Sequence, residues 1–281
     1  MTQADVGLKL AIVDIVRKLG VVDGDTVMVH SGISRLADLS PLEKPSPAVI
    51  LASLHEALSE AVGADGTLVT PAFFYDYARR GKPFHVDRSP PDASLGLYPR
   101  YMFSLPGNKR SLNPIGSLQA VGKHAETICA HRSATGFGLA SPWTHLVELG
   151  AKCLIIGTPY ILTFPHHIEA LLGVPHVYNK LHRTPVYVAG VEIRFPVITQ
   201  VRYLKYGIEY LTDKTYADLT ETGILQSMTI NGVNAQMAGF PALQEFFVEK
   251  LIDDPYYLLE APPEFVAGEP PDDGPAGPRR R

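Results

Sequence analysis

Short apolar runs of strand type alternate with amphipathic helical patterns along this chain, and this alternation restricts the fold more than any other feature. The runs TVMVH (26–30), GTLVTPAFF (66–74) and CLIIG (153–157) are rich in β-branched residues, as buried strands are. Helical patterns at 4–19 and 46–62 stop at Gly20 and Gly63, and WTHLVELG leads directly into CLIIG. Helices alternating with apolar strands predict an α/β fold whose strands are largely parallel.

Two stretches depart from that pattern. Residues 184–203 alternate polar and apolar side chains around a glycine turn, which predicts an antiparallel hairpin inserted into the α/β domain. Residues 75–106 are rich in Pro, Gly, Tyr, Asp and Arg and show no sustained periodicity. We expect a long loop there, and long loops in compact domains are often functional. Its acidic side chains either meet a cationic substrate or are solvated loop charges.

The length of 281 residues and the composition, with 46% hydrophobic and 19% charged residues, describe a globular chain with a sizeable core. We expect one domain over residues 1–260. Residues 261–281, rich in Pro and Gly and ending in three arginines, predict a disordered tail. A net charge of -4 gives no basic footprint for nucleic acid. No segment reaches membrane-spanning length and no signal peptide is visible, so we expect a cytoplasmic protein.

Both cysteines, Cys129 and Cys153, stand in apolar surroundings, and nothing resembles a disulfide framework or a CxxC site. We expect buried thiols in a reducing compartment.

His166 and Glu169 are the strongest candidates for chemistry. The segment PHHIEALLG predicts a short helix with Thr163 or Phe164 at the cap, Pro165 in the first turn and Gly173 at its end. Residues three apart share a helix face, so His166 and Glu169 can touch, while His167 is turned aside. A carboxylate that orients an imidazole leaves the free ring nitrogen as a general base. The same pattern also occurs as an ordinary surface or core pair.

The loop SGIS (31–34), which follows the first strand, is the second candidate. Its small residues let backbone N–H groups approach a ligand, and a phosphate suits such a site. A plain strand-to-loop turn uses the same residues.

Five collinear segments resemble the antibiotic N-acetyltransferase family typified by aminoglycoside 3-N-acetyltransferases, which is distinct from the GNAT fold. The segments are DTVMVHSGIS (25–34), GTLVTPAFF (66–74), RSLNPIGSLQAVG (110–122), the stretch from GFGLASPW to LLGVPH (136–176), and the C-terminal stretch 215–259. The resemblance implies an α/β/α sandwich around a mixed central sheet. It also implies transfer of an acyl group from acetyl-CoA, with no metal, to an amine. In this family that activity is associated with antibiotic resistance.

The resemblance also implies roles for individual residues. His166 falls on the catalytic histidine and Glu169 on the acidic position of an HxAE-like motif. Glu209 is the best candidate for the downstream carboxylate that orients the histidine in family members. The coenzyme A phosphate and pantetheine region falls on four residues of the first loop, and the thioester end on a serine of the third segment: Ser31, Gly32, Ile33, Ser34 and Ser117. The acceptor pocket falls on Phe74, Tyr75, Asp76 and Asn113.

Three positions depart from the family pattern. Asn113-Pro114 replaces the His-Pro of many members, Ile168 replaces a small residue before Glu169, and the 75–106 loop has its own sequence. The loop and Asn113 belong to the region that forms the family's acceptor pocket. The acceptor is therefore an aminoglycoside, another amino sugar or a related amine, and N- or O-acylation both remain open. The expected partners are an acyl-CoA and this small acceptor, without nucleic acid or membrane, and a homodimer is one option for assembly.

The mechanism we expect is direct attack of the amine on the thioester with His166 as general base. A ping-pong route through Cys153 is an alternative. Two other classes also stay open. One is a metal-dependent hydrolase that uses His166, His167 and Glu169 with His176 or His182, although HHIE lacks the HExxH spacing. The other is a binding protein that keeps the fold without activity.

Overall fold

The computed structural model describes residues 5–130, 133–203 and 206–266, and a seven-stranded sheet forms its centre. The strand order is β11-β12-β6-β1-β2-β5-β4. The strands are β1 (Thr26–Ser31), β2 (Thr67–Pro71), β4 (Lys109–Arg110), β5 (Leu118–Gly122), β6 (Lys152–Ile156), β11 (Gln226–Ile230) and β12 (Val233–Gly239). Within this seven-stranded sheet, β1 pairs in parallel with β2 and with β6, and the other four pairings are antiparallel. The mixed sheet is confirmed, and the expectation of largely parallel strands is wrong.

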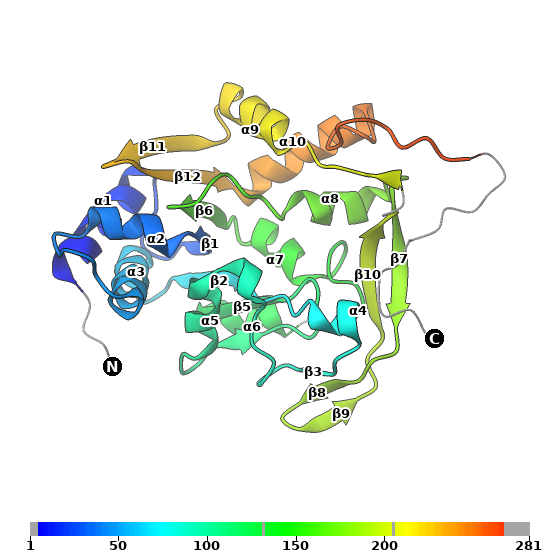
Figure 1. The fold of residues 1–281 in the computed structure, drawn as a ribbon, viewed down its shortest axis with the longest axis horizontal. Coiled ribbons are helices and arrows are strands. Elements are labelled where there is room, and N and C mark those ends of the chain that lie inside the picture. The colour runs from blue at the N-terminus through cyan, green and yellow to red at the C-terminus, as the bar shows by residue number, and fades with distance from the viewer. Residues whose placement is uncertain (1–4, 131–132, 204–205, 267–281) are drawn as a thin grey trace.

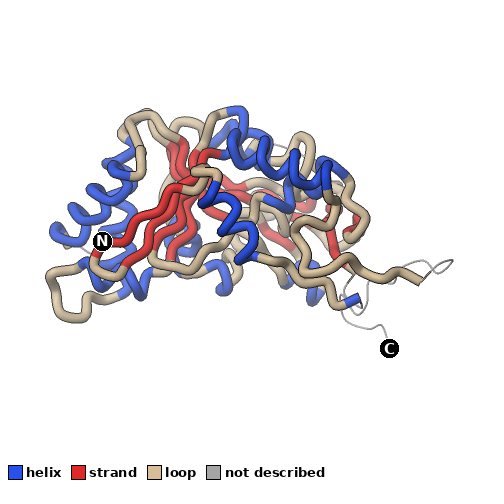
Figure 2. The backbone as a smooth tube through the Cα atoms, turned by 90° about the horizontal axis from the view of Figure 1, so that it is seen from above, coloured by secondary structure: helices blue, strands red, loops and turns tan. Residues whose placement is uncertain are grey.

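Helices cover both faces of the sheet (Figures 1 and 2). Side chains alternate along β1, so Val27 and Val29 join one buried cluster and Met28 the other. The cluster of Val27 and Val29 contains α1 (Val6–Lys18), α2 (Ile33–Leu36), α3 (Pro47–Val62) and α5 (Leu97–Phe103). The cluster of Met28 contains α6 (Ala125–Cys129), α7 (Pro142–Glu148), α8 (Pro165–Leu172), α9 (Thr212–Glu221) and α10 (Phe240–Asp253). Two apolar faces buried by two helical layers give the predicted α/β/α sandwich.

The inserted hairpin is confirmed within residues 184–203, where β8 (Val186–Val188) pairs antiparallel with β9 (Val191–Ile193). β8 also pairs in parallel with β3 (Phe84–His85). The following strand β10 (Val197–Arg202) pairs antiparallel with β7 (Val177–His182) in a sheet of its own. These two small sheets lie at the end of the molecule away from α1 (Figure 1).

The predicted long loop at 75–106 contains regular structure. It holds α4 (Asp76–Arg80), β3, the 3₁₀ turn η2 (Ala93–Leu95) and α5. α5 has an unfavourable sequence with Pro99 inside it, but its Tyr98 and Met102 are fully buried against the sheet. Tertiary burial therefore overrides local propensity there.

The sequence interpretation also missed the β11–β12 hairpin. Asn231 and Gly232 at its turn both have positive φ, 50° and 77°, which is typical of a two-residue type I′ hairpin turn. The pattern Asn-Gly between alternating residues was the available signal.

Residues 267–281, which make up most of the predicted disordered tail, lie outside the described residues. In the described part, Phe265 packs against Tyr203 and Tyr206, with ring centroids 5.6 and 4.9 Å apart. Among the described residues, every helix is too short or too polar to cross a bilayer.

Candidate active site

Both leading candidates, His166 and Glu169, lie on α8. This helix begins at Pro165, after the loop that follows β6. Phe164 is the N-cap residue, Pro165 occupies the first turn, and Gly173 ends the helix with φ of 66°. The left-handed conformation at the last position favours glycine. The helix predicted from the sequence is therefore present with its predicted ends.

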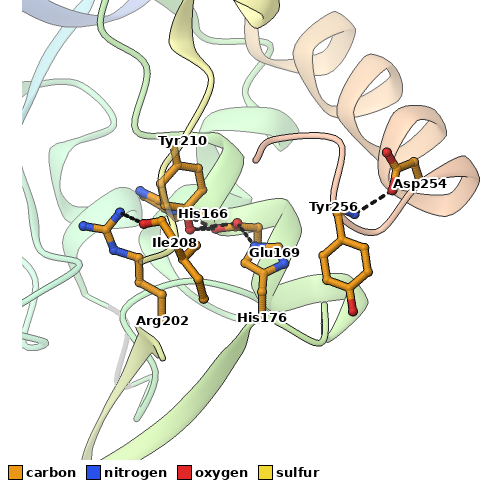
Figure 3. A network of polar contacts seen from close by, with 8 residues as sticks. All are labelled: His166, Glu169, His176, Arg202, Ile208, Tyr210, Asp254 and Tyr256. Atoms are coloured by element: carbon orange, nitrogen blue, oxygen red, sulfur yellow. Dashed lines mark hydrogen bonds and ion pairs between the residues drawn. The ribbon is translucent and has the colours of Figure 1, made fainter. Parts of the chain in front are cut away.

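Glu169 is the centre of a polar cluster (Figure 3). Its side chain is fully buried. His166 Nδ1 lies 2.7 Å from Glu169 Oε2, and His176 Nε2 lies 2.8 Å from Glu169 Oε1. The Tyr210 hydroxyl donates to both oxygens, at 2.9 and 3.2 Å. The predicted contact between His166 and Glu169 is thus present, with two further partners on the same carboxylate.

Glu169 is ionised in this setting. Burial by itself raises the pKa of a carboxyl group, but the charges and hydrogen bonds of His166 and His176 outweigh burial and lower the pKa of Glu169 to about 2. An ionised carboxylate only accepts hydrogen bonds, so His166 Nδ1 carries the hydrogen of their contact. In the neutral ring, Nε2 then bears the free lone pair that a general base needs.

The imidazole of His166 is held on two sides and remains reachable. Phe137 and Tyr210 meet the ring edge to face, with centroids 5.8 and 5.2 Å away, and the side chain keeps 38% exposure. Phe137 also meets Phe73 at 6.2 Å, and Phe73 meets Tyr75 at 5.8 Å. Ring contacts therefore connect the end of β2 to His166.

Phe137 also lines an open cavity of about 200 Å³. It is lined by the 135–139 loop, Ala170, Leu171, Asn179 and Gln200. In the amide orientation that satisfies both groups, Gln200 donates to the His166 carbonyl and accepts from the Ala170 N–H. None of the lining residues is charged.

His167 faces away from this cluster, as the helix spacing predicted. It is 1% exposed, and Nδ1 accepts the Gly138 N–H at 3.2 Å and lies 3.4 Å from the Ser141 hydroxyl. Burial lowers the pKa of His167 to about 4. This ring is a neutral packing residue between α8 and the start of α7.

Glu209 lies elsewhere. Its side chain is exposed, and its described hydrogen bond is made by its backbone carbonyl, which accepts the Glu260 N–H at 3.1 Å. The next residue, Tyr210, reaches Glu169 instead. The assignment of Glu209 as the orienting carboxylate thus has no supporting contact among the described residues.

The first loop is built by close backbone packing. A Cβ on Gly32 would lie 2.3 Å from the Gly157 carbonyl oxygen, and the Gly32 N–H donates to the Ile156 carbonyl at 3.0 Å. The approach of the β1 and β6 ends thus requires glycine at position 32 whether or not a ligand binds there. Ser31 and Ile33 are partly exposed and Ser34 is exposed, so this loop can be reached by a ligand.

Ser117 and Asn113 are buried inside the third segment. The Ser117 hydroxyl donates to the Ala72 carbonyl at 2.6 Å. Asn113 Oδ1 accepts the Ile115 and Gly116 N–H groups, at 3.1 and 3.4 Å. Asn113 Nδ2 donates to the carbonyls of Ala134 and Ile198, at 2.9 and 3.3 Å. Because all hydrogen-bonding capacity of this amide is used internally, Asn113 fixes neighbouring loops.

The other acceptor-pocket candidates lie at the end of β2. Phe74 stacks on Phe84 with centroids 6.0 Å apart, and its N–H donates to the Pro114 carbonyl at 2.7 Å. Tyr75 is partly exposed and lies near Phe73. Asp76 pairs with Arg80 at 3.4 Å and Lys82 at 2.6 Å. The structure thus brings Phe74 next to the Asn113 segment and connects Tyr75 to His166 through rings.

The residues of the metal alternative do not surround one ion site: His166 and His176 hydrogen-bond to Glu169, and the other two histidines lie elsewhere. His167 faces Gly138, and His182 Nε2 lies 2.7 Å from the Thr199 hydroxyl. Within residues 5–130, 133–203 and 206–266, no three His, Cys, Asp or Glu side chains are grouped to hold a metal ion. The cysteine alternative is also disfavoured, because burial raises the pKa of the Cys153 thiol to about 12.

Three site residues were missed by the sequence interpretation: Phe137, His176 as a partner of Glu169, and Tyr210. His176 was noted only as a possible metal ligand. Tyr210 is 41 residues from Glu169, and no local spacing rule connects such positions. Only the fold brings them together.

Solved acetyltransferase structures share this fold. The structure described as AAC-IIIb with CoASH superposes with a TM-score of 0.73 at 24% identity, covering 91% of this chain and 98% of that chain. AAC-VIa bound to sisomicin gives a TM-score of 0.72 at 21% identity, covering 89% and 98%.

Sequence comparison identifies the family. The family model for aminoglycoside 3-N-acetyltransferase matches residues 28–252. Aminoglycoside N(3)-acetyltransferase III of Acinetobacter baumannii is 28% identical over 239 residues, which cover 79% of this chain and 74% of that protein. The chain belongs to the aminoglycoside 3-N-acetyltransferase family, whose members are coenzyme A-dependent N-acetyltransferases.

Proposed function

We propose that this protein transfers an acetyl group from acetyl-CoA to an amine of an aminoglycoside or a related amino sugar, with His166 as general base. The observation that carries the proposal is the exposed His166 ring, bound through Nδ1 to the buried, ionised Glu169. Family membership supports the acyl donor and the amine acceptor. The relative bound to sisomicin supports an aminoglycoside as the first acceptor to test.

The reaction balances with these groups. The acceptor nitrogen attacks the thioester carbonyl while His166 Nε2 takes a proton from it. A typical alkyl amine is mostly protonated at neutral pH, so a base is needed for this attack. The carbon–sulfur bond then breaks, and the thiolate leaves as coenzyme A after taking up a proton. Glu169 keeps its charge throughout and stabilises the imidazolium that forms on His166.

Release of free thiol from acetyl-CoA tests the activity. The protein is incubated with aminoglycosides, nucleotide-linked amino sugars and small amines, and products are checked by mass spectrometry for one added acetyl group. We expect thiol release with at least one amino sugar. Absence of release with the whole panel, while acetyl-CoA still binds, would support an inactive binding protein.

The His166→Ala variant tests the base. Its turnover should fall about 10²–10⁴-fold, the usual contribution of general base catalysis, while coenzyme A binding measured by calorimetry is retained. The control is Glu209→Gln, which removes an exposed carboxylate and should keep nearly full turnover. Near-normal turnover of His166→Ala would contradict the assignment. A large loss in Glu209→Gln would restore Glu209 as the orienting group.

A further inference from the structure

We propose that His176 and Tyr210 are positioning residues that hold Glu169 in one orientation and share its charge, so that His166 alone exchanges a proton with the acceptor. This inference rests on the proposed function of His166. It concerns two residues outside α8: His176 directly precedes β7, and Tyr210 precedes α9.

Three side chains of the described residues donate to the Glu169 carboxylate. Glu169 Oε2 receives His166 at 2.7 Å and Tyr210 at 3.2 Å, and Oε1 receives His176 at 2.8 Å and Tyr210 at 2.9 Å. Tyr210 therefore bridges the two oxygens. With both oxygens occupied from different directions, Glu169 has a single position in which all contacts are made, and the orientation of His166 follows from it.

His176 cannot replace His166 as a base. Its side chain is fully buried, and its Nε2 is committed to Glu169. Its other nitrogen, Nδ1, is buried without a hydrogen-bond partner among the described residues. The ring therefore lacks access to a substrate proton, whereas His166 keeps 38% exposure.

Tyr210 is fixed as a donor. Burial, together with the charge of Glu169, raises the pKa of its hydroxyl well above the usual range, so the hydroxyl stays protonated. The segment that carries Tyr210 is held by the C-terminal segment, since the Leu211 N–H donates to the Leu258 carbonyl at 2.8 Å and Tyr210 forms a bridge with Leu259.

The charged and titratable groups that face the cluster come from several segments. The Arg202 guanidinium of β10 lies 5.4 Å from the Tyr210 ring centre and donates to the Ile208 carbonyl at 3.0 Å. The Tyr256 ring lies 6.0 Å from the His176 ring, and its hydroxyl points away from Glu169 (Figure 3). His167, on the same helix, faces Gly138. Arg202 thus places a positive charge beside Tyr210. Among these residues, Glu169 carries the negative charge.

The direction of the expected pH effect follows from the sharing of charge. Each donor to Glu169 draws part of its charge away from the His166 Nδ1–H. Removing one donor concentrates that charge on His166 and favours its protonated form. A base must be unprotonated to act, so the acid limb of the rate profile should move to higher pH.

Tyr210→Phe tests this with a minimal change, because only the hydroxyl is lost. We expect kcat to fall about 3- to 10-fold and the acid limb of kcat/KM to move up by about half to one pH unit, with the KM for acetyl-CoA unchanged. The matched control is Tyr256→Phe, which removes a nearby hydroxyl that does not touch Glu169. It should keep the wild-type profile.

His176 is tested by a pair of variants. His176→Gln can keep one N–H donor toward Glu169 and should retain more activity than His176→Leu, which keeps none. If His176→Leu does not fold, Tyr210→Phe alone still decides the proposal. Two-bond ¹H–¹⁵N spectra of the whole protein should show His166 in the Nδ1–H tautomer at high pH.

Each outcome separates the two proposals. If His166→Ala is inactive but Tyr210→Phe keeps both the wild-type kcat and the wild-type acid limb, the positioning role is wrong and the base assignment stands. Lower thermal stability with an unchanged limb would mean a purely structural role and would also overturn it. If His166→Ala is active, the proposed function itself fails.

Discussion

His166 and His167 are neighbours in sequence, yet α8 directs them into opposite environments. His166 is exposed by 38% and shares the buried Glu169 with two other donors. His167 is 1% exposed, accepts the Gly138 N–H at 3.2 Å and stacks on Phe164 with centroids 5.3 Å apart. The partly exposed ring of His166 is bound to a buried charge, and the ring of His167 fills a buried site between helices.

The difference shows that a partner, and not the residue type, decides what an imidazole does. An ionised carboxylate at Nδ1 fixes the tautomer of His166 and leaves Nε2 free. A backbone N–H at Nδ1 of His167, together with burial, disfavours its protonated form and lowers its pKa to about 4. His167 is therefore neutral at physiological pH, but its ring is buried and does not act as a base.

The largest expected effect that separates the two rings is on turnover. Glu169→Gln replaces the ionised acceptor by a neutral amide, and kcat should fall about 10²–10⁴-fold because the His166 tautomer and imidazolium lose their support. His167→Gln should stay within about threefold of wild type after correction for folded protein. Steady-state kinetics of both variants checks this. Equal losses in the two variants would mean that the rings are not functionally distinct.

The next effect is on the free energy of unfolding, which a change at His167 should lower more than a change at His166. His167→Ala leaves a cavity and an unpaired Gly138 N–H, and the free energy of unfolding should fall by about 2–4 kcal/mol. His166→Ala removes a partly exposed ring, while His176 and Tyr210 still donate to the buried Glu169, so it should cost less. Urea denaturation followed by circular dichroism measures both. A more destabilised His166→Ala would show that the cluster around Glu169 mainly stabilises the fold.

The smallest effect is the pH dependence of stability, in which each residue has its own window. The folded pKa of His167, about 4, lies below its usual 6.5, so the unfolded chain binds the proton more readily and stability falls as pH decreases from 6.5 through 4. The folded pKa of Glu169, about 2, lies below its usual 4.5, so its contribution is present above pH 4.5 and is lost toward pH 2.

Melting curves between pH 2 and 7 of the two glutamine variants should resolve these windows. His167→Gln should lose stability less steeply than wild type in the upper window, to which the buried His30 with its pKa of about 4 also contributes. Glu169→Gln should lose stability less steeply in the lower one. A wild-type curve that is flat from pH 7 to 4 would contradict the neutral, buried state of His167.

Much of this architecture was predictable because its signals are local. Strand runs 26–30 and 153–157, the ends of α3 at Ser46 and Gly63, and the hairpin within 184–203 follow from hydrophobic period and from Gly and Pro at element ends. α5 was not predictable, because its stability comes from the burial of Tyr98 and Met102 and not from helix propensity. The antiparallel outer strands β5 and β12 likewise depend on which edges the chain returns to.

The sequence by itself determined that a helix would start at Pro165 and place His166 beside Glu169, since helix geometry makes residues three apart neighbours. Only the tertiary structure decided that His176 and Tyr210 would donate hydrogen bonds to the Glu169 carboxylate and that Glu209 would remain exposed. Tyr210 is 41 residues from Glu169, and such a contact forms only because the sheet and its covering helices bury both residues at one place. Local spacing fixes which side chains can meet along one helix, whereas burial in the folded core fixes which distant donors must satisfy a buried charge.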